Sequence, residues 1–292
     1  MMNAFGTVRL LVRGALVQLG AEDANQTADY DNAAATYDAY YALCLGKCAM
    51  QLLDRLPIRE GSTVADLACG TGFATRYLAE RVGPQGYVIG VDLSQGMLAR
   101  NQEQLSAAGL TNARLVHADV LSFLRTTPDH SLDGVVCVWG VCYLELDAFM
   151  REARRVLKPG GFLGVVENTA STLRSVSRLF TSAMARHPEA LVKRMHIALP
   201  HGQKQLVREA RRAGLHVQEA WEGGMAVPCR NGREIVDYMV KSGASSGFLD
   251  SLDKAQVDQV LETFVQLADR SFATGGGVEV RHDFCALIAR GE

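Results

Sequence analysis

Short apolar runs alternate with segments of helical periodicity through the middle of the chain. The apolar runs lie at residues 62–68, 86–93, 113–120, 132–144 and 161–168. Between them, apolar residues recur every three or four positions, which predicts helices over 72–82, 95–109 and 146–161. The run at 132–144 contains a strand that is apolar throughout, as expected of a strand covered on both faces. Strands alternating with helices predict an α/β fold, a doubly wound parallel sheet with right-handed crossovers.

The pattern changes on both sides of this region. Apolar spacing predicts helices over 5–20 and 33–56 before it. After it, we expect a mostly helical stretch, a helix, a strand, two more helices and a last strand, at 171–197, 202–214, 215–223, 233–243, 253–272 and 282–290. We therefore divide the chain into amino-terminal helices (1–56) and a core (57–292), with helical insertions at about 169–200 and 225–277. Insertions of this length indicate a cap that encloses a small ligand.

Composition narrows the possible partners. The formal net charge of the 292 residues is −2 and no polybasic run occurs, so nothing favours nucleic acid as a partner. Arginines interrupt the apolar run at 5–20, which is too short to cross a membrane; we expect this helix to pack on its own domain or on a second subunit, so a homodimer is possible. The seven cysteines show no metal-ligand spacing and are typical of reduced thiols in the cytoplasm.

Acidic residues and glycines follow the predicted strands at their carboxyl ends, where open parallel sheets bind ligands. Asp66 ends the first strand, and a Gly-Thr-Gly turn at 70–72 follows it. Asp92 ends the second strand and could accept both hydroxyls of a ribose. Asp119 follows the third strand, where a carboxylate could accept from an exocyclic amine such as that of adenine.

A dinucleotide-binding loop explains this set poorly. Its third small residue would fall at Thr75, which is β-branched and larger. Asp66 would also place an anion close to a pyrophosphate, whereas it would support a ligand that carries an ammonium group. An adenine, a ribose with both hydroxyls free and an ammonium-bearing tail together describe S-adenosylmethionine.

With these residues, the chain resembles the class I S-adenosylmethionine-dependent methyltransferases, in the UbiE-like group that acts on small molecules. "VADLACGTG" is similar to the first motif of that family, "GVDLS" to the second and "HADV" to the third. "REARRVLKPGG" resembles the helix and turn before its fifth strand. The resemblance spans about residues 63–161 and implies a Rossmann-like sheet of seven strands, mostly parallel, with the last strand antiparallel.

The same resemblance implies a cofactor site and a role for the amino-terminal helices, which cover the cofactor in that family. Asp66 and the 70–72 turn would hold the methionine end, Asp92 the ribose, and Asp119 the adenine amine. The residues expected to contact S-adenosylmethionine are Asp66, Ala68, Gly70, Thr71, Gly72, Asp92, Leu93, Met97, Asp119 and Val120. No metal ion is expected.

Methyl transfer from a sulfonium is an in-line displacement on an activated carbon, so the protein mainly supplies alignment and desolvation. A general base is needed only for a weak nucleophile such as a hydroxyl, and the sequence leaves the catalytic residues unknown. The candidates are aromatic residues near the site, an acid after the fifth strand and two histidines of the insertions: Tyr37, Tyr41, Trp139, Tyr143, Glu167, His196 and His201. Each has an alternative role in packing or at the surface.

We expect an enzyme that methylates O, N, C or S of a small metabolite or natural product. A protein on the same fold that binds S-adenosylmethionine without catalysis, or uses it in another reaction, is the alternative. An arsenite methyltransferase is a weaker one, because Cys44, Cys48, Cys137, Cys142 and Cys229 do not reproduce the thiolate pattern of that family.

Overall fold

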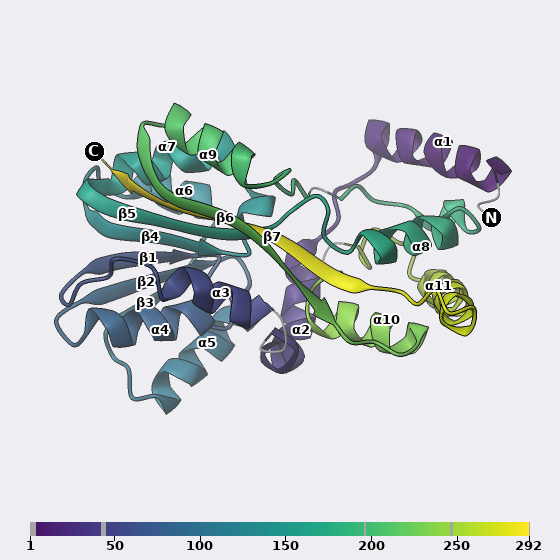
Figure 1. The fold of residues 1–292 in the computed structure, drawn as a ribbon, viewed down its shortest axis with the longest axis horizontal. Helices are drawn as coiled ribbons and strands as arrows, with labels where there is room; N and C mark the ends of the chain where they lie inside the picture. The colour runs from purple at the N-terminus through teal and green to yellow at the C-terminus, as the bar shows by residue number, and fades with distance from the viewer. Residues whose placement is uncertain (1–3, 42–44, 196, 246–247, 292) are drawn as a thin grey trace. The chain divides into compact units, whose positions relative to one another are not determined.

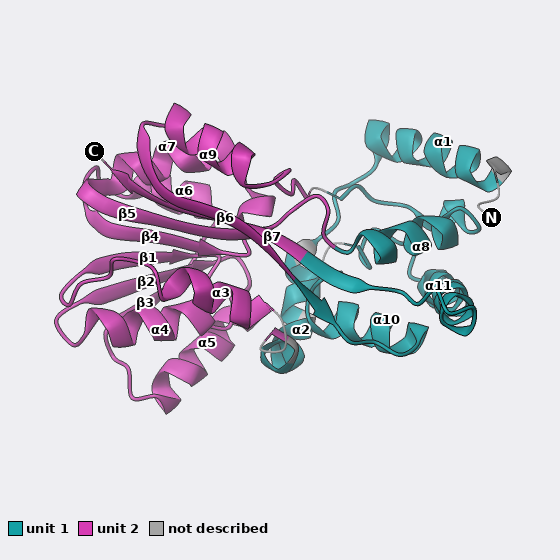
Figure 2. Ribbon diagram, in the orientation of Figure 1, with its two compact units in different colours: residues 1–40, 173–196, 225–282 teal, residues 41–172, 197–224, 283–292 magenta. Residues whose placement is uncertain are grey.

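The computed structural model describes residues 4–41, 45–195, 197–245 and 248–291 (Figure 1). Two compact units make up the chain, and each is assembled from separate segments (Figure 2). Unit 1 consists of residues 1–40, 173–196 and 225–282. Unit 2 consists of residues 41–172, 197–224 and 283–292.

Unit 2 contains the predicted sheet, in the strand order β3-β2-β1-β4-β5-β7-β6. Neighbouring strands from β3 to β5 are parallel, and β7 runs antiparallel to β5. The sheet thus confirms the predicted fold class of seven strands with an antiparallel last one. The strands are β1 (Thr63–Leu67), β2 (Tyr87–Asp92), β3 (Ala113–His117), β4 (Leu132–Val138), β5 (Leu157–Asn168), β6 (Leu215–Val227) and β7 (Val280–Gly291).

Helices cover both faces of this sheet (Figure 1). One face carries α3 (Leu45–Leu53), α4 (Phe73–Val82) and α5 (Gln95–Ala107). The other carries α6 (Val120–Thr126), α7 (Leu146–Val156) and α9 (Gln203–Arg212), which pack on the inner side chains of β1, β4, β5 and β7. Because both faces are covered, β4 is apolar and buried from Gly134 to Val138, as the sequence pattern predicts.

Unit 1 is helical, with a core of its own. Its helices are α1 (Ala4–Gly20), α2 (Gln26–Tyr41, whose last residue belongs to unit 2), α8 (Arg174–Met184), α10 (Gly232–Lys241) and α11 (Val257–Ala273), with a short turn η2 (Pro188–Ala190). Phe180 of α8 packs edge-on against Phe248, with ring centroids 3.9 Å apart, and also contacts Phe264 of α11. Tyr238 and His282 are both buried, and the Tyr238 hydroxyl forms a hydrogen bond of 2.8 Å with Nε2 of His282.

Several predicted boundaries were wrong. The helix expected to reach residue 197 ends at Met184, with only η2 beyond it, because Pro188 cannot continue a helix and instead begins that turn. The strand expected over 113–120 ends at His117, because the Asp119 carboxylate accepts from Ser122 N and starts α6, a helix that the apolar pattern did not indicate. Lys158–Gly160 belong to β5 and not to a turn after a longer helix.

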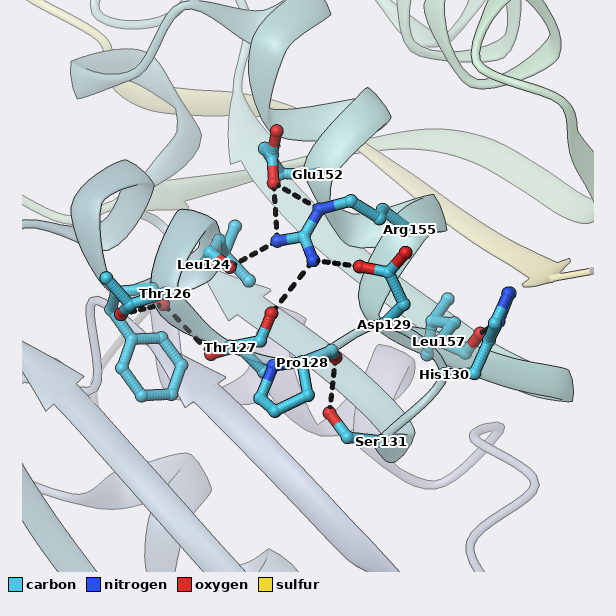
Figure 3. A network of polar contacts seen from close by, with 11 residues as sticks. Leu124, Thr126, Thr127, Pro128, Asp129, His130, Ser131, Glu152, Arg155 and Leu157 are labelled. Atoms are coloured by element: carbon cyan, nitrogen blue, oxygen red, sulfur yellow. Dashed lines mark hydrogen bonds and ion pairs between the residues drawn. The ribbon is translucent and has the colours of Figure 1, made fainter.

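Arg155 of α7 anchors the loop between α6 and β4 (Figure 3). Its guanidinium donates to the carbonyl oxygens of Thr127 and Leu124 and to the carboxylates of Asp129 and Glu152. Five guanidinium donors in a fixed plane suit such a set of acceptors. The loop therefore has a defined path into β4, the strand that leads to the candidate site.

We expect Phe149→Ala to lower the free energy of unfolding by about 3–5 kcal/mol, because its ring is fully buried in the core between α7 and the sheet. Urea denaturation followed by circular dichroism measures this change. Arg151→Ala on the same helix is the matched control, since it removes only an exposed ion pair with Asp147. Equal unfolding midpoints for the two variants would contradict this account of the core.

Candidate functional site

Asp66 lies at the carboxyl end of β1 with its side chain 1% exposed. Its Oδ2 accepts a hydrogen bond of 2.6 Å from the hydroxyl of Thr75, while Oδ1 has no partner among the described residues. Burial raises the pKa of this carboxyl to about 7, although the Thr75 hydrogen bond lowers it, and the nearby Asp92 charge raises it further. The carboxylate therefore titrates near neutral pH and has one acceptor atom to offer.

The Gly-Thr-Gly turn follows directly and brings the backbone close to β2. Gly70 has φ +53° and Gly72 has φ +96°, a region that favours glycine. The amide of Gly70 donates to Oδ2 of Asp92 at 2.8 Å, which ties the turn to the end of β2. A Cβ at Gly70 would meet no protein atom within 4 Å, so this side of the turn is open. Thr71 between them is buried.

Asp92 ends β2 and is held by two backbone amides. Oδ2 accepts from Gly70 N, and Oδ1 accepts from Ser94 N at 2.9 Å. Ser94 then caps α5 by accepting from the amide of Met97 at 3.0 Å. Met97 is buried and Leu93 is half exposed. The sequence-predicted residues after β1 and β2 thus come together at one edge of the sheet.

The end of β3 lies beside the end of β2, because Asp92 pairs with His117 in the sheet. His117 Nε2 lies 2.9 Å from the Leu93 carbonyl, and its Nδ1 lies 3.4 Å from the amide nitrogen of Gln95. Since a carbonyl only accepts, Nε2 carries the proton. Asp119 is exposed and caps α6, and the next residue, Val120, is buried.

Two non-glycine residues adopt left-handed backbone angles where β1 and β4 end. Ala68 has φ +54° and Trp139 has φ +61°. The two ends adjoin, because a Cβ at Gly140 would lie 2.4 Å from the Cβ of Ala68. The indole of Trp139 donates to the hydroxyl of Tyr41 at 3.0 Å and packs edge-on against Phe284. Backbone strain of this kind is concentrated at functional sites.

Glu167 lies near the end of β5 with its side chain 1% exposed. Its Oε2 accepts from Cys142 N at 3.1 Å and its Oε1 from Asn168 N at 2.8 Å. Burial raises the pKa of this carboxyl to about 7, while the backbone amides oppose the shift. Glu167 therefore anchors the short turn η1 (Val141–Tyr143) to β5.

The tyrosine candidates are separated. Tyr41 is buried in unit 2, where its ring packs 5.0 Å from that of Phe73. Tyr37 belongs to unit 1 and packs against Tyr30, with ring centroids 6.2 Å apart. Tyr143 is half-buried on η1. Tyr41 also accepts the hydrogen bond from the indole of Trp139.

Of the two histidine candidates, His201 lies on the surface. His201 is exposed in a groove of about 870 Å³ that α7, α9 and residues 197–201 form, and its backbone amide donates to Gln205. The charged side chains of this groove include Glu145, Arg151 and Arg212. His196 lies outside the described residues.

The described cysteines are free thiols, and most are buried. Burial raises the pKa of Cys69, Cys137 and Cys142, and the neighbouring carboxylates raise it further. These thiols therefore stay protonated at neutral pH. In the described part of the chain, no three His, Cys, Asp or Glu side chains gather as a metal site requires.

Sequence reasoning missed two polar residues beneath the turn, Thr75 and Asn101. Thr75 was considered only as an obstacle to a dinucleotide, yet it donates to Asp66. Asn101 lies four residues after Met97 and four before Leu105, on the buried stripe of α5. A polar residue in an apolar stripe was the available signal.

Comparison with known proteins agrees with this geometry. Residues 64–161 match the family model described as a methyltransferase domain. The chain is 33% identical over 135 residues to a demethylmenaquinone methyltransferase of Geobacillus stearothermophilus, a match that covers 46% of this chain and 57% of that protein. The chain thus spans little more than half the length of this relative.

Solved structures share the fold at low sequence identity. The [4+2]-cyclase SpnF superposes with a TM-score of 0.57 at 16% identity, over 93% of this chain and 97% of that one. Geranyl diphosphate C-methyltransferase from Streptomyces coelicolor superposes with a TM-score of 0.51 at 17% identity, over 84% and 76% of the two chains. Residues 64–161 are thus similar to known methyltransferase domains, and the chain shares its fold with solved methyltransferase structures.

Proposed function

We propose that this chain is an S-adenosylmethionine-dependent methyltransferase that transfers a methyl group to O, N, C or S of a small molecule. The observation that carries the proposal is the carboxylate of Asp66. It is buried, it keeps one oxygen without a partner among the described residues, and it lies four residues before the first glycine of the turn. A buried polar atom without a partner is costly, so a bound group that donates to it would repay that cost.

The residues present fit the cofactor. An ammonium group at the amino-acid end of the ligand would donate to Asp66, directly or through water. The open side of Gly70 leaves room for a ligand against the backbone of the turn. Asp92 is oriented by two backbone amides, and its carboxylate, which can accept several hydrogen bonds, would hold the ribose hydroxyls.

We assign the remaining predicted contacts to the same edge of the sheet. Ala68 and Thr71 belong to the turn beside the amino-acid end, while Leu93 and Met97 follow Asp92 on the adenine side. Asp119 and Val120 would flank the adenine amine. When bound, S-adenosylmethionine supplies a methyl carbon activated by its sulfonium. The chain's own contribution is to hold that end in place and to exclude water.

The acceptor would meet the residues at the ends of β4 and β5. Trp139 and Tyr143 come directly after β4, and the hydrogen bond from the indole of Trp139 to Tyr41 fixes the indole. Glu167 has a pKa near 7 and is the candidate for proton acceptance if the acceptor is a hydroxyl. Acceptors that are already nucleophilic need no such base, and Glu167 would then only hold η1 in place.

A second function on this fold is a reaction other than methyl transfer. The [4+2]-cyclase SpnF shares the architecture over most of both chains, so the fold alone does not select the reaction. Non-catalytic binding of the cofactor is a third outcome. The labelling experiment below separates these functions from methyl transfer.

The proposal also includes where in the cell the enzyme acts. Among the residues that the structure describes, no helix has both the length and the apolar character that a membrane span requires. The free thiols are typical of a reducing compartment, which supports action in the cytoplasm on a small molecule and not on nucleic acid. That the segments 169–200 and 225–277 cap the acceptor stays a prediction.

We expect isothermal titration to show binding of S-adenosylmethionine, and Asp92→Asn to weaken it about tenfold or more, because a charged acceptor for the ribose hydroxyls is lost. Glu103→Gln on the exposed side of α5 is the control and should bind as the unmodified protein does. Absence of heat from the unmodified protein would overturn the cofactor assignment.

The same protein, incubated with methyl-labelled S-adenosylmethionine and demethylmenaquinone or a metabolite extract, should yield a labelled small molecule and S-adenosylhomocysteine. Binding without label transfer would favour the cyclase-like or non-catalytic functions over methyl transfer.

The affinity for S-adenosylmethionine should rise by up to about tenfold between pH 6 and pH 8. The pKa of Asp66 is raised to about 7 without ligand, so the carboxylate that attracts the ammonium forms as the pH rises through that value. Titration calorimetry at several pH values measures this. Asp66→Asn should bind more weakly and lose most of the pH dependence. An equal pH dependence in this variant would show that another group titrates.

We further propose a homodimer formed through α1. Arg9 pairs with Glu189 and Arg13 donates to the Leu191 carbonyl, which places the arginines against unit 1. Along α1, five large apolar side chains are more than half exposed, those of Val8, Leu11, Val12, Leu16 and Leu19. A stripe of exposed apolar side chains suits a second, identical stripe.

Leu16→Asp should convert a dimer to a monomer in sedimentation experiments, because it buries a charge in the apolar interface. Gln18→Asp on the same helix serves as the control. A monomeric unmodified protein at all concentrations, or an unchanged dimer in the Leu16 variant, would refute this interface.

A further inference from the structure

A buried amide lies beneath the glycine turn of the cofactor site. The side chain of Asn101 reaches it from α5 and is fully buried. Its Nδ2 lies 3.1 Å from the hydroxyl of Thr75 and 3.4 Å from the carbonyl oxygen of Gly70. It also lies 3.5 Å from Sγ of Cys69, so the two hydrogens of this amide face α4 and the residues from Cys69 to the turn.

The direction of these hydrogen bonds is fixed by chemistry. An amide nitrogen only donates, so the Thr75 oxygen accepts from Asn101. The hydroxyl hydrogen of Thr75 is then directed to Oδ2 of Asp66, 2.6 Å away. Asn101, Thr75 and Asp66 form a chain of donors that ends on the carboxylate.

Asn101 also fits closely against the turn. A Cβ at position 72 would lie 2.2 Å from Oδ1 and 2.5 Å from Cγ of Asn101, so only glycine can occupy that position while the amide is present. The angle φ of +96° at Gly72 adds a second reason. The amide thus supports the turn from below.

The burial of the Asn101 amide is unfavourable for stability. Oδ1 of Asn101 is buried and has no partner among the described residues. Desolvating such an atom costs free energy that an apolar side chain in the same stripe, like Met97 or Leu105, does not incur. Stability alone does not explain an asparagine here.

We propose that Asn101 is a positioning residue of the cofactor site, which acts through Thr75 to orient the Asp66 carboxylate toward the ammonium of the ligand. This inference rests on the proposed binding of S-adenosylmethionine. Without the amide, the Thr75 hydroxyl is free to rotate toward other acceptors, and Asp66 loses the donor that favours its charged form.

The test compares two ligands in titration calorimetry at pH 7.5. S-adenosylmethionine carries the amino-acid end, whereas 5′-methylthioadenosine shares its adenine, ribose and sulfur but lacks that end. We expect Asn101→Ala to weaken S-adenosylmethionine about tenfold, as loss of a charge-assisted contact would, and to change 5′-methylthioadenosine less than twofold. Gln102→Ala, exposed on the same helix, should change neither affinity.

A cycle of variants tests the route through Thr75. Thr75→Val keeps the shape of the side chain and removes the hydroxyl, so it should weaken S-adenosylmethionine about as much as Asn101→Ala does. Adding Asn101→Ala to Thr75→Val should then have little further effect, because the shared path is already broken. Circular dichroism and thermal melting establish that each variant is folded, and Thr75→Val carries the test if Asn101→Ala does not fold.

The outcomes are distinct. If the unmodified protein binds neither ligand, the proposed function fails and this inference with it. If it binds both and Asn101→Ala weakens both equally, Asn101 only supports the turn and the inference is wrong while the function stands. The inference is also wrong if S-adenosylmethionine affinity does not change, or if the effects of the two variants simply add.

Discussion

Burial of one carboxylate at the end of the central strand sets the conditions for the rest of the site. Asp66 is buried beside Thr75 of α4, and burial raises its pKa to about 7. The surrounding residues then orient the carboxylate and the turn beside it. Thr75 donates to one oxygen, Asn101 directs Thr75, and Asp92 holds the turn in place through Gly70. The other oxygen remains for a ligand.

The motifs that follow the strands could be predicted from sequence because each is recognised from a few consecutive residues. Each acid comes directly after an apolar run, and parallel strands end at one edge, so Asp66 and Asp92 had to be neighbours. The same argument predicted the order of strands and helices from β1 to β5 apart from the short helix α6. Asn101 and Thr75 were missed because their partners lie on other elements, and helical periodicity shows which face is buried without showing what it meets.

Boundaries outside this region failed for a related reason. The pattern at 171–197 is amphipathic throughout, yet the helix stops before Pro188 and the chain after it pairs with distant residues such as Leu252. The left-handed angles at Ala68 and Trp139 gave no signal either, since neither residue type favours them. They are imposed by the close approach of β1 and β4, where Gly140 packs on Ala68.

The division of unit 1 into three segments affects how the protein reaches its native state. One segment begins the chain, one follows β5, and the last ends at residue 282, ten residues before the terminus. Much of the parallel sheet comes from one continuous stretch, 41–172, and can assemble from contacts within it. Unit 1 assembles later. Its helix α1 packs beside η2 and its helix α11 packs on α8, and the members of each pair are separated by long stretches of sequence. During synthesis α1 therefore leaves the ribosome long before its partners, with its apolar face exposed to chaperones and to other nascent chains.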